Sequence, residues 1–279
     1  MNKPIVIIIF AILLGYSSCQ KKGIHAPNTD QNTSNFSSNL EFDHINIWVD
    51  DPLLTKQKLI DIGFNAVPDS LSQIHKGQGT SGRYFNFLNT YIELIFVSDQ
   101  DELNANNRKN KDLDFTTRAN FKQNGASPFS IALKMKDYHI DSIPFENVRY
   151  HQNWMAKDAS IYAAKNSKLK INEPSVFVVY PEIEAFSVDS YEELDNFPSE
   201  DNTWKELFKH PNGAQKISKI NITSKHLNDL DSETLNAVNA IKELNIQNGS
   251  QHLIEVYFDK HIQNKSFDLR PTLPLIIYL

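Results

Sequence analysis

The sequence predicts an α+β fold built from a repeated βαβββ unit. Between Leu40 and Val97, an alternating apolar segment, a helix-like segment and three further strand-like segments follow one another. A similar order begins again at Pro128 and, in part, at Lys216. Recurrence of one order of elements within a chain indicates an internal repeat. With 279 residues, 40% of them hydrophobic and 22% charged, the chain is long enough to bury a sizeable core.

The first unit begins with a strand whose two faces differ. One face is predicted to carry Phe42, His44, Asn46 and Trp48, and the other Asp43, Ile45, Ile47 and Val49. The helix that follows is expected to start at Pro52 with Asp51 as its cap and to end at Gly63. Phe64–Val67 is predicted to form the second strand.

A hairpin completes the first unit. Two runs rich in aromatic and β-branched residues, 84–88 and 91–97, flank a short turn at Asn89 and Thr90. Before them, glycines at positions 77, 79 and 82 indicate a loop with two interpretations: a turn that needs glycine for its backbone geometry and leaves His75 exposed, or part of a cleft whose backbone N–H groups are free to meet an oxygen-rich ligand. The second run contains one carboxylate, Glu93, and a buried carboxylate needs a cation, metal or hydrogen-bond donor.

The remaining segments complete the predicted organisation. The expected boundaries are 1–19 for a signal peptide, 20–39 for a flexible tether, 40–98 for the first module, 99–126 for a polar insertion or linker, 127–185 for the second module, 186–214 for a connecting segment, and 215–279 for a third partial module with a C-terminal strand. Within them, helices are expected at 140–147, 203–209 and 232–244, and strands at 128–135, 174–180, 216–223, 252–258 and 273–279. At most a loose helix is expected in the polar insertion.

The N-terminus has the pattern of a signal peptide. Lys3 precedes the apolar run Ile5–Leu14, which is too short for a stable membrane span, and small residues follow up to Cys19. Cys19 is the only cysteine, so an intramolecular disulfide is excluded. Its position resembles the lipobox of bacterial lipoproteins, which implies acylation of Cys19 and a lipid-anchored protein of the cell envelope, periplasmic or surface-facing. Plain secretion or an uncleaved anchor are the alternatives.

The composition and motifs restrict the chemistry. A formal net charge of −6 with scattered Lys and Arg residues argues against a nucleic-acid partner. The sequence has no Gly-x-Ser-x-Gly elbow, no Walker loop and no dinucleotide fingerprint. If the chain is an enzyme, these exclusions leave metal or acid–base chemistry on a small molecule.

Four motifs follow one another along the chain: Phe42-Asp43-His44, His75-Lys76-Gly77-Gln78-Gly79-Thr80, Tyr91-Ile92-Glu93-Leu94 and His210-Pro211-Asn212-Gly213-Ala214. In this order they resemble the glyoxalase-like domain family of the vicinal oxygen chelate superfamily, which includes glyoxalase, bleomycin resistance and extradiol dioxygenase proteins. The resemblance implies paired βαβββ modules whose curved mixed sheets enclose a cleft. In many members a divalent metal such as zinc, iron, manganese or nickel lies there.

By this resemblance, His44 and Glu93 fall on the metal-ligand positions of the first module, whereas Ser130 and Val179 stand at those of the second. A protein-held divalent site usually needs three or four protein ligands, so His75, His210 or Glu255 would have to complete it. Without metal, Arg83 or Lys219 is the expected partner of Glu93. Glu93 and His75 are the candidate catalytic residues, and the candidate ligand-binding residues are Asn46, Trp48, Gly79, Thr80 and Arg83.

Two functions follow from this site. In the first, the chain is a glyoxalase-like lyase, isomerase or dioxygenase, in which a divalent ion binds two substrate oxygens and Glu93 or His75 moves a proton. In the second, it is a catalytically inactive, metal-free protein that binds or sequesters a small ligand in the same cleft.

Overall fold

The computed structural model describes residues 39–227 and 232–279. The predicted signal peptide, the lipidation site Cys19 and the predicted tether up to residue 38 lie outside the described residues. Among the helices that the structure does describe, none has the length and apolar character needed to cross a membrane.

The larger of two sheets has eight strands in the order β2-β3-β4-β1-β5-β8-β7-β6. Their bounds are β1 Leu40–Trp48, β2 Ile74–His75, β3 Thr80–Phe87, β4 Thr90–Val97, β5 Phe129–Met135, β6 Asn147–Tyr150, β7 Ile161–Ala164 and β8 Ser175–Val178. β1 pairs in parallel with β4, β5 pairs in parallel with β8, and β1 and β5 pair antiparallel to each other. Two units with the same strand order are therefore joined edge to edge, and the predicted α+β fold of repeated βαβββ modules is confirmed.

The units differ from the prediction in two elements. In the first unit, α1 spans Pro52–Asp61 with Asp51 as its cap, but the second strand is Ile74–His75 and not Phe64–Val67. In the second unit, a single 3₁₀ turn at Ile140–Ser142 replaces the expected helix. Pro144, two residues after the turn, has no backbone N–H to continue a helix.

The polar insertion is more ordered than predicted. It forms α2 Gln100–Lys109, α3 Phe115–Ala119 and α4 Phe121–Asn124. Asp99 caps α2 by accepting from the backbone N–H of Glu102, and acidic residues in its first turn and basic ones in its last turn favour the helix dipole. Few apolar residues were needed, because α2 buries only Leu103 and Asn106.

The smaller sheet has the order β10-β9-β11-β13-β12. Its elements are β9 Ile217–Lys225, α6 Glu233–Asn239, β10 Leu244–Gly249, β11 Leu253–Phe258, β12 Ser266–Asp268 and β13 Leu275–Tyr278. β9 lies between β10 and β11, whereas the first strand of each βαβββ unit pairs with the last strand of its own unit. This sheet therefore does not repeat the order expected of a third module.

The connecting segment contains α5 Tyr191–Asn196. Short 3₁₀ helices lie at Asp69–Leu71, Ile140–Ser142, Lys165–Lys168, Pro181–Ile183, Thr203–Phe208 and Asp259–His261. Leu88, at the turn of the first hairpin, is buried by residues of the connecting segment, namely Val188, Leu194 and Phe208.

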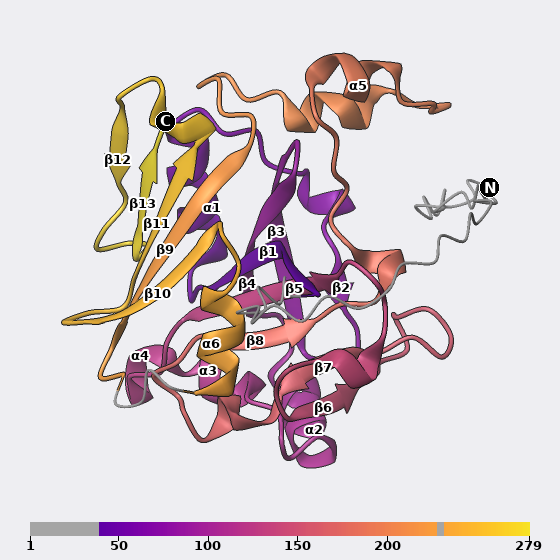
Figure 1. The fold of residues 1–279 in the computed structure, drawn as a ribbon, viewed down its shortest axis with the longest axis vertical. Helices are drawn as coiled ribbons and strands as arrows, with labels where there is room; N and C mark the ends of the chain where they lie inside the picture. Colours follow the sequence, from indigo (N-terminus) through magenta and orange to yellow (C-terminus); the bar gives the residue numbers. More distant parts are fainter. Residues whose placement is uncertain (1–38, 228–231) are drawn as a thin grey trace, which may run out of the picture. The chain divides into compact units, whose positions relative to one another are not determined.

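The two faces of the larger sheet have different environments. Side chains such as Ile45, Phe85 and Ile131 join one hydrophobic core with residues of the smaller sheet, which runs from orange to yellow in Figure 1. Phe64, just after α1, contacts Phe258 of β11 with ring centroids 5.4 Å apart. The other face of the larger sheet is left for the candidate site.

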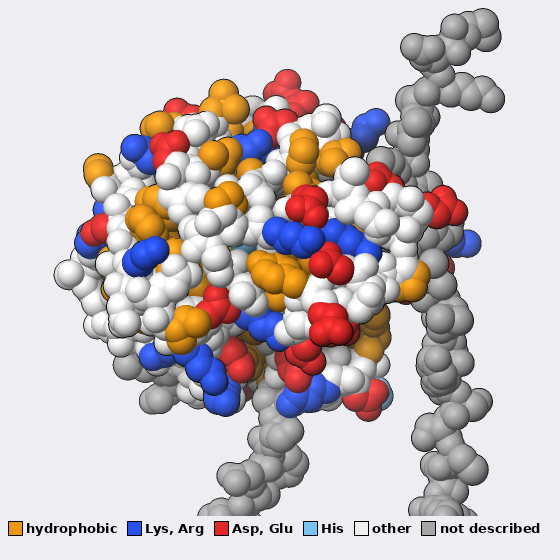
Figure 2. Space-filling view, turned by 90° about the horizontal axis from the view of Figure 1, so that it is seen from above, with side chains coloured by type: hydrophobic (Ala, Val, Ile, Leu, Met, Phe, Trp, Pro, Cys, Tyr) orange, Lys and Arg blue, Asp and Glu red, His pale blue; other side chains and the backbone are white. Residues whose placement is uncertain are grey.

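Figure 2 shows one face of the molecule, on which acidic and basic side chains are interspersed with hydrophobic ones.

Candidate functional site

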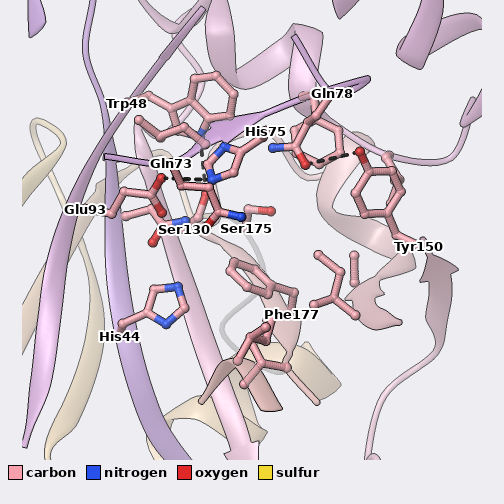
Figure 3. A pocket seen from close by; sticks show the side chains of 18 of the residues that line it. His44, Trp48, Gln73, His75, Gln78, Glu93, Ser130, Tyr150, Ser175 and Phe177 are labelled. Atoms are coloured by element: carbon pink, nitrogen blue, oxygen red, sulfur yellow. Dashed lines mark hydrogen bonds and ion pairs between the residues drawn. The ribbon is translucent and has the colours of Figure 1, made fainter. Parts of the chain in front are cut away.

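A cavity of about 150 Å³ lies against the central strands of the larger sheet (Figure 3). Alternate side chains of β1, β4, β5 and β8 form its floor, because successive side chains of a strand point to opposite faces. Leu113, Asp114 and Phe115, where the chain enters α3, form part of its wall. This contribution was not predicted, because the segment 99–126 was expected to be a polar insertion or linker.

Glu93 is buried at this cavity, and no Lys or Arg is among the described residues that line the cavity. The residue Glu93 is only 4% exposed to solvent. Tyr84, which is directly opposite on β3, donates a hydrogen bond to Glu93 Oε1 over 3.2 Å. His75 Nε2 lies 3.8 Å from the same oxygen. Burial raises the pKa of Glu93 to about 7, and the hydrogen bond from Tyr84 only partly opposes this.

Gly82 leaves room for this carboxylate. A Cβ atom at position 82 would lie 2.5 Å from Glu93 Oε1 and 2.4 Å from the hydroxyl of Tyr84. Gly82 is part of β3 and pairs with Ile95, so it is not in the predicted glycine loop. Its missing side chain lets Tyr84 and Glu93 approach each other.

His75 connects Glu93 to a chain of hydrogen bonds. The Gln78 amide donates to Thr80 Oγ1 over 2.8 Å, so the Thr80 hydroxyl proton is free to go to His75 Nδ1, 2.9 Å away. This assigns the remaining ring proton to Nε2, which lies 3.2 Å from the hydroxyl oxygen of Tyr84. Burial, and secondarily the charge of His44, lower the pKa of His75 to about 4. A neutral His75 thus donates toward Tyr84, which donates to Glu93.

His44 is oriented by a carboxylate that the sequence analysis placed on the opposite face. His44 Nδ1 donates to Asp43 Oδ1 over 2.5 Å, and Asp43 Oδ2 accepts from the backbone N–H of Ala185 over 2.9 Å. A register shift between Phe42 and His44 disturbs the alternation of β1 and explains why two successive side chains meet. The ring of Tyr91 stacks on His44 at 4.1 Å, with its hydroxyl 3.1 Å from Nε2.

The strand pairings correct the predicted equivalence between the two units. β1 and β5 run antiparallel, and their pair Ile45 and Ile131 occupies equivalent positions in the two units. His44 and Ser130, each one residue earlier in its strand, are therefore equivalent too, as expected. One residue later in each strand, Asn46 pairs with Glu93 and Ala132 pairs with Phe177, so Phe177 is the equivalent of Glu93. Phe177, and not Val179, therefore stands in the place of a second carboxylate. Its ring meets His44 edge-on, with centroids 5.8 Å apart.

The donor set does not fit a divalent ion held by the protein. Among the residues that the structure describes, no three His, Cys, Asp or Glu side chains are grouped so that they could hold a metal. His210 is committed elsewhere, since Nδ1 accepts from the N–H of Asn65 and Nε2 donates to the carbonyl of Asn86. Glu255 accepts from Tyr278 in the smaller sheet. Neither of them completes a site with His44 and Glu93.

Two predicted partners of Glu93 also lie elsewhere. Arg83 is on the opposite face of β3 from Tyr84; its Nε is 3.1 Å from Asp69 Oδ1 and its guanidinium lies 4.8 Å from the ring centroid of Phe96. Lys219 lies over the ring of Tyr257 in the smaller sheet. Arg83, a predicted ligand-binding residue, thus does not line this cavity.

Gly79 and Thr80 do not line the cavity and instead contact residues next to it. A Cβ at Gly79, whose φ is +84°, would lie 2.2 Å from the backbone nitrogen of Leu103, so this residue packs under α2. Thr80 is fully buried and holds His75. The loop N–H of Gly77 donates to Glu102 over 2.8 Å and is not free for a ligand.

Asn46 and Trp48 do line the cavity, as the alternation of β1 predicts. Trp48 Nε1 donates to Ser130 Oγ over 3.3 Å (Figure 3). Asn46 is 5% exposed, and its Oδ1 has no hydrogen-bond partner. Buried polar atoms are usually satisfied, so Asn46 is a candidate contact for a ligand.

Besides Phe115 and Phe177, sequence reasoning missed four further aromatic residues of the wall. They are Tyr84, Tyr91, Tyr150 and Trp154. Counting back from the turn of the hairpin would have placed Tyr84 opposite Glu93, and Tyr91 lies two residues before Glu93 on the same face. For the other two no local signal exists, because they come from the second unit.

Comparison with known proteins shows similarity in structure only. No protein-family model matches the chain, and no curated protein matches it. A solved structure of a hypothetical protein from Staphylococcus aureus has 15% identity and a TM-score of 0.49, covering 85% of this chain and 97% of that chain. Methylmalonyl-CoA epimerase in complex with methylmalonyl-CoA and NH4+ has 15% identity and a TM-score of 0.34, covering 53% and 99%. The epimerase from Mycobacterium tuberculosis has 12% identity and a TM-score of 0.35, covering 54% and 96%.

Proposed function

We propose that this chain is an isomerase-type enzyme that moves a proton on carbon next to a carbonyl group of a small oxygen-rich molecule. One observation supports this most: the buried Glu93 carboxylate is held at the cavity by the neutral donor Tyr84 and not by a cation. Such a carboxylate keeps its affinity for a proton, and its pKa of about 7 suits a general base near neutral pH.

In the proposed reaction, Glu93 takes the proton from the carbon beside the carbonyl. The electron pair of that C–H bond forms the new C=C bond, and the π pair of the carbonyl moves onto its oxygen, which gives an enolate. Glu93 then returns the proton to the same carbon, or to the former carbonyl carbon while the proton of a neighbouring hydroxyl moves to the enolate oxygen and that hydroxyl carbon becomes the new carbonyl, so that no other reactant is consumed. The same carboxylate serves as base and acid.

Tyr91 is the proposed donor to the enolate oxygen. It lines the cavity beside His44, whose ring Asp43 fixes through Nδ1 and whose Nε2 lies 3.1 Å from the Tyr91 hydroxyl. Burial and the charge of Glu93 raise the pKa of Tyr91 far above its usual value, so its hydroxyl stays protonated. Since the residues present do not fit a protein-held divalent ion, no step of the proposal uses one.

The test is proton exchange in deuterated water, followed by NMR on the full chain with a panel of small carbonyl compounds. Glu93→Gln should reduce exchange by about 10²–10⁴-fold. Glu255→Gln, in the smaller sheet, is the matched control and should exchange like the wild type. Binding without exchange by the wild type would support the sequestering function instead, and undiminished exchange by Glu93→Gln would overturn the assignment.

We also propose that Cys19 is acylated and anchors the protein to a membrane of the cell envelope. The proposal rests on the apolar run 5–14 and the small residues before Cys19. Cys19→Ala should leave the precursor unprocessed or release it to the soluble fraction. Unchanged mass and fractionation of that variant would contradict lipidation.

A further inference from the structure

We infer that the cavity selects an uncharged hydroxy-carbonyl compound and disfavours carboxylates and phosphate esters. The inference names the substrate class of the proposed isomerase and so rests on that function for turnover. The binding preference itself follows from charge, wall chemistry and size, each of which is independent of the reaction.

The charges at the cavity are unfavourable for an anion. No Lys or Arg is present among the described residues that line it. Two carboxylates do line it, Glu93 and Asp114. The Arg118 guanidinium donates to Asp114 over 2.7 Å and compensates its charge, whereas the hydrogen-bond donor to Glu93 is the uncharged Tyr84 hydroxyl. A ligand carboxylate or phosphate would meet Glu93 without a compensating cation, in a site where low polarity strengthens the repulsion.

The walls favour a compact carbon skeleton. His44 is covered by Tyr91, and Trp154 packs on His75 with ring centroids 5.3 Å apart. Phe177 and Tyr150 face the same space (Figure 3). Aromatic faces bind apolar and ring-shaped groups well, while their hydroxyl groups supply a few directional contacts. A fully polar anion gains little from such walls.

Size and one unsatisfied atom define the class further. A cavity of 150 Å³ accommodates about six to ten non-hydrogen atoms, the size range of a benzene-like ligand. The unpartnered Oδ1 of Asn46 lies next to Glu93 in the sheet and requires a donor, which a ligand hydroxyl provides. A carbonyl to accept from Tyr91 together with a hydroxyl to donate to Asn46 describes a hydroxyketone or hydroxyaldehyde.

The test compares matched probes on the full chain by ligand-observed NMR. Dihydroxyacetone and 2-hydroxyacetophenone are the uncharged probes, and pyruvate and phenylglyoxylate are anions of similar size. Each uncharged probe should bind at least about ten-fold more tightly than its anionic counterpart at pH 8, where Glu93 is ionised. Glu93→Gln should narrow this ratio. Equal or tighter binding of the anions by the wild type would overturn the inference.

A second variant separates charge from shape. Gln73 lines the cavity and is exposed, so Gln73→Lys adds a cation with little risk to folding. This variant should improve binding of the anions by about ten-fold and leave the uncharged probes unchanged. No gain for the anions would show that charge does not set the preference and would refute the inference. Binding of uncharged probes without proton exchange would leave this inference standing and contradict only the proposed enzyme function.

Discussion

Replacing Arg118 with methionine should destabilise the fold strongly. Arg118 is fully buried and donates to Asp114 Oδ2 over 2.7 Å. It also donates to the carbonyl groups of Ser127, Ser167, Ile171 and Glu173 over 2.8–3.0 Å. Methionine fills similar space but leaves a buried carboxylate and these carbonyl groups without their donor. Breaking one partner of a buried ion pair costs about 3–5 kcal/mol.

This cost corresponds to a fall of roughly 6–20 °C in Tm, at about 2–4 °C per kcal/mol for a chain of this size. Thermal and urea unfolding of Arg118→Met, Asp114→Asn and the double variant would measure it. Because the two side chains interact directly, the double variant should lose at least about 1 kcal/mol less than the sum of the single variants. Arg270→Met, at an exposed pair with Asp268, should keep the wild-type Tm.

Two results would refute this reasoning. A loss below about 1 kcal/mol in Arg118→Met would mean that water replaces the guanidinium at little cost. Strict additivity of the two single variants would mean that Asp114 and Arg118 do not stabilise each other. Either result would also remove the support for a fixed cavity wall at Asp114.

Three further predictions concern the site and the pH dependence of stability. Tyr84→Phe removes the hydrogen bond that lowers the pKa of Glu93, so the acidic limb of the exchange rate should move to higher pH; an unchanged pH profile would contradict the contact. Gly82→Ala should cut exchange at least ~ten-fold by displacing Glu93, and wild-type exchange would show that the carboxylate tolerates a Cβ there. Burial lowers the pKa of His210 from 6.5 to about 4, so the unfolded chain binds a proton that the folded chain does not, and stability should fall by up to ~3 kcal/mol as the pH drops from above 6.5 to 4. Urea unfolding at several pH values should show a weaker dependence in His210→Gln, and an equal dependence would exclude His210 as a cause.

The parts of the site that could be predicted from sequence depend on one strand period and one hairpin. Alternation in β1 placed His44, Asn46 and Trp48 on one face, and all three line the cavity. Glu93 was singled out because a carboxylate within an apolar strand needs a partner. The partner found is Tyr84, which the hairpin register brings opposite to Glu93.

The parts that could not be predicted depend on contacts between distant segments or on a local irregularity. Asp43 reaches His44 only because the register of β1 shifts there. Gly79 was predicted to be accessible to a ligand, but α2 packs against it. The sequence of α2 is so polar that the burial of Leu103 and Asn106 could not be predicted from it. The smaller sheet departs from the repeat because β10 inserts beside β9, a pairing for which the sequence contains no local pattern.

The repeat also explains why His44 and Glu93 lie on one side of the cavity. The second unit repeats the strand order of the first, and the antiparallel pairing of β1 with β5 relates equivalent positions by a twofold axis at the pair Ile45 and Ile131. Ser130 and Phe177 occupy the positions of His44 and Glu93, so the second unit provides a hydroxyl and an aromatic ring where the first provides an imidazole and a carboxylate. A ligand between them therefore meets ionisable groups on one side and a mainly apolar wall on the other. That asymmetry leaves Glu93 without a second carboxylate or a cation beside it, which is the condition under which a single buried acid can both accept and return a proton.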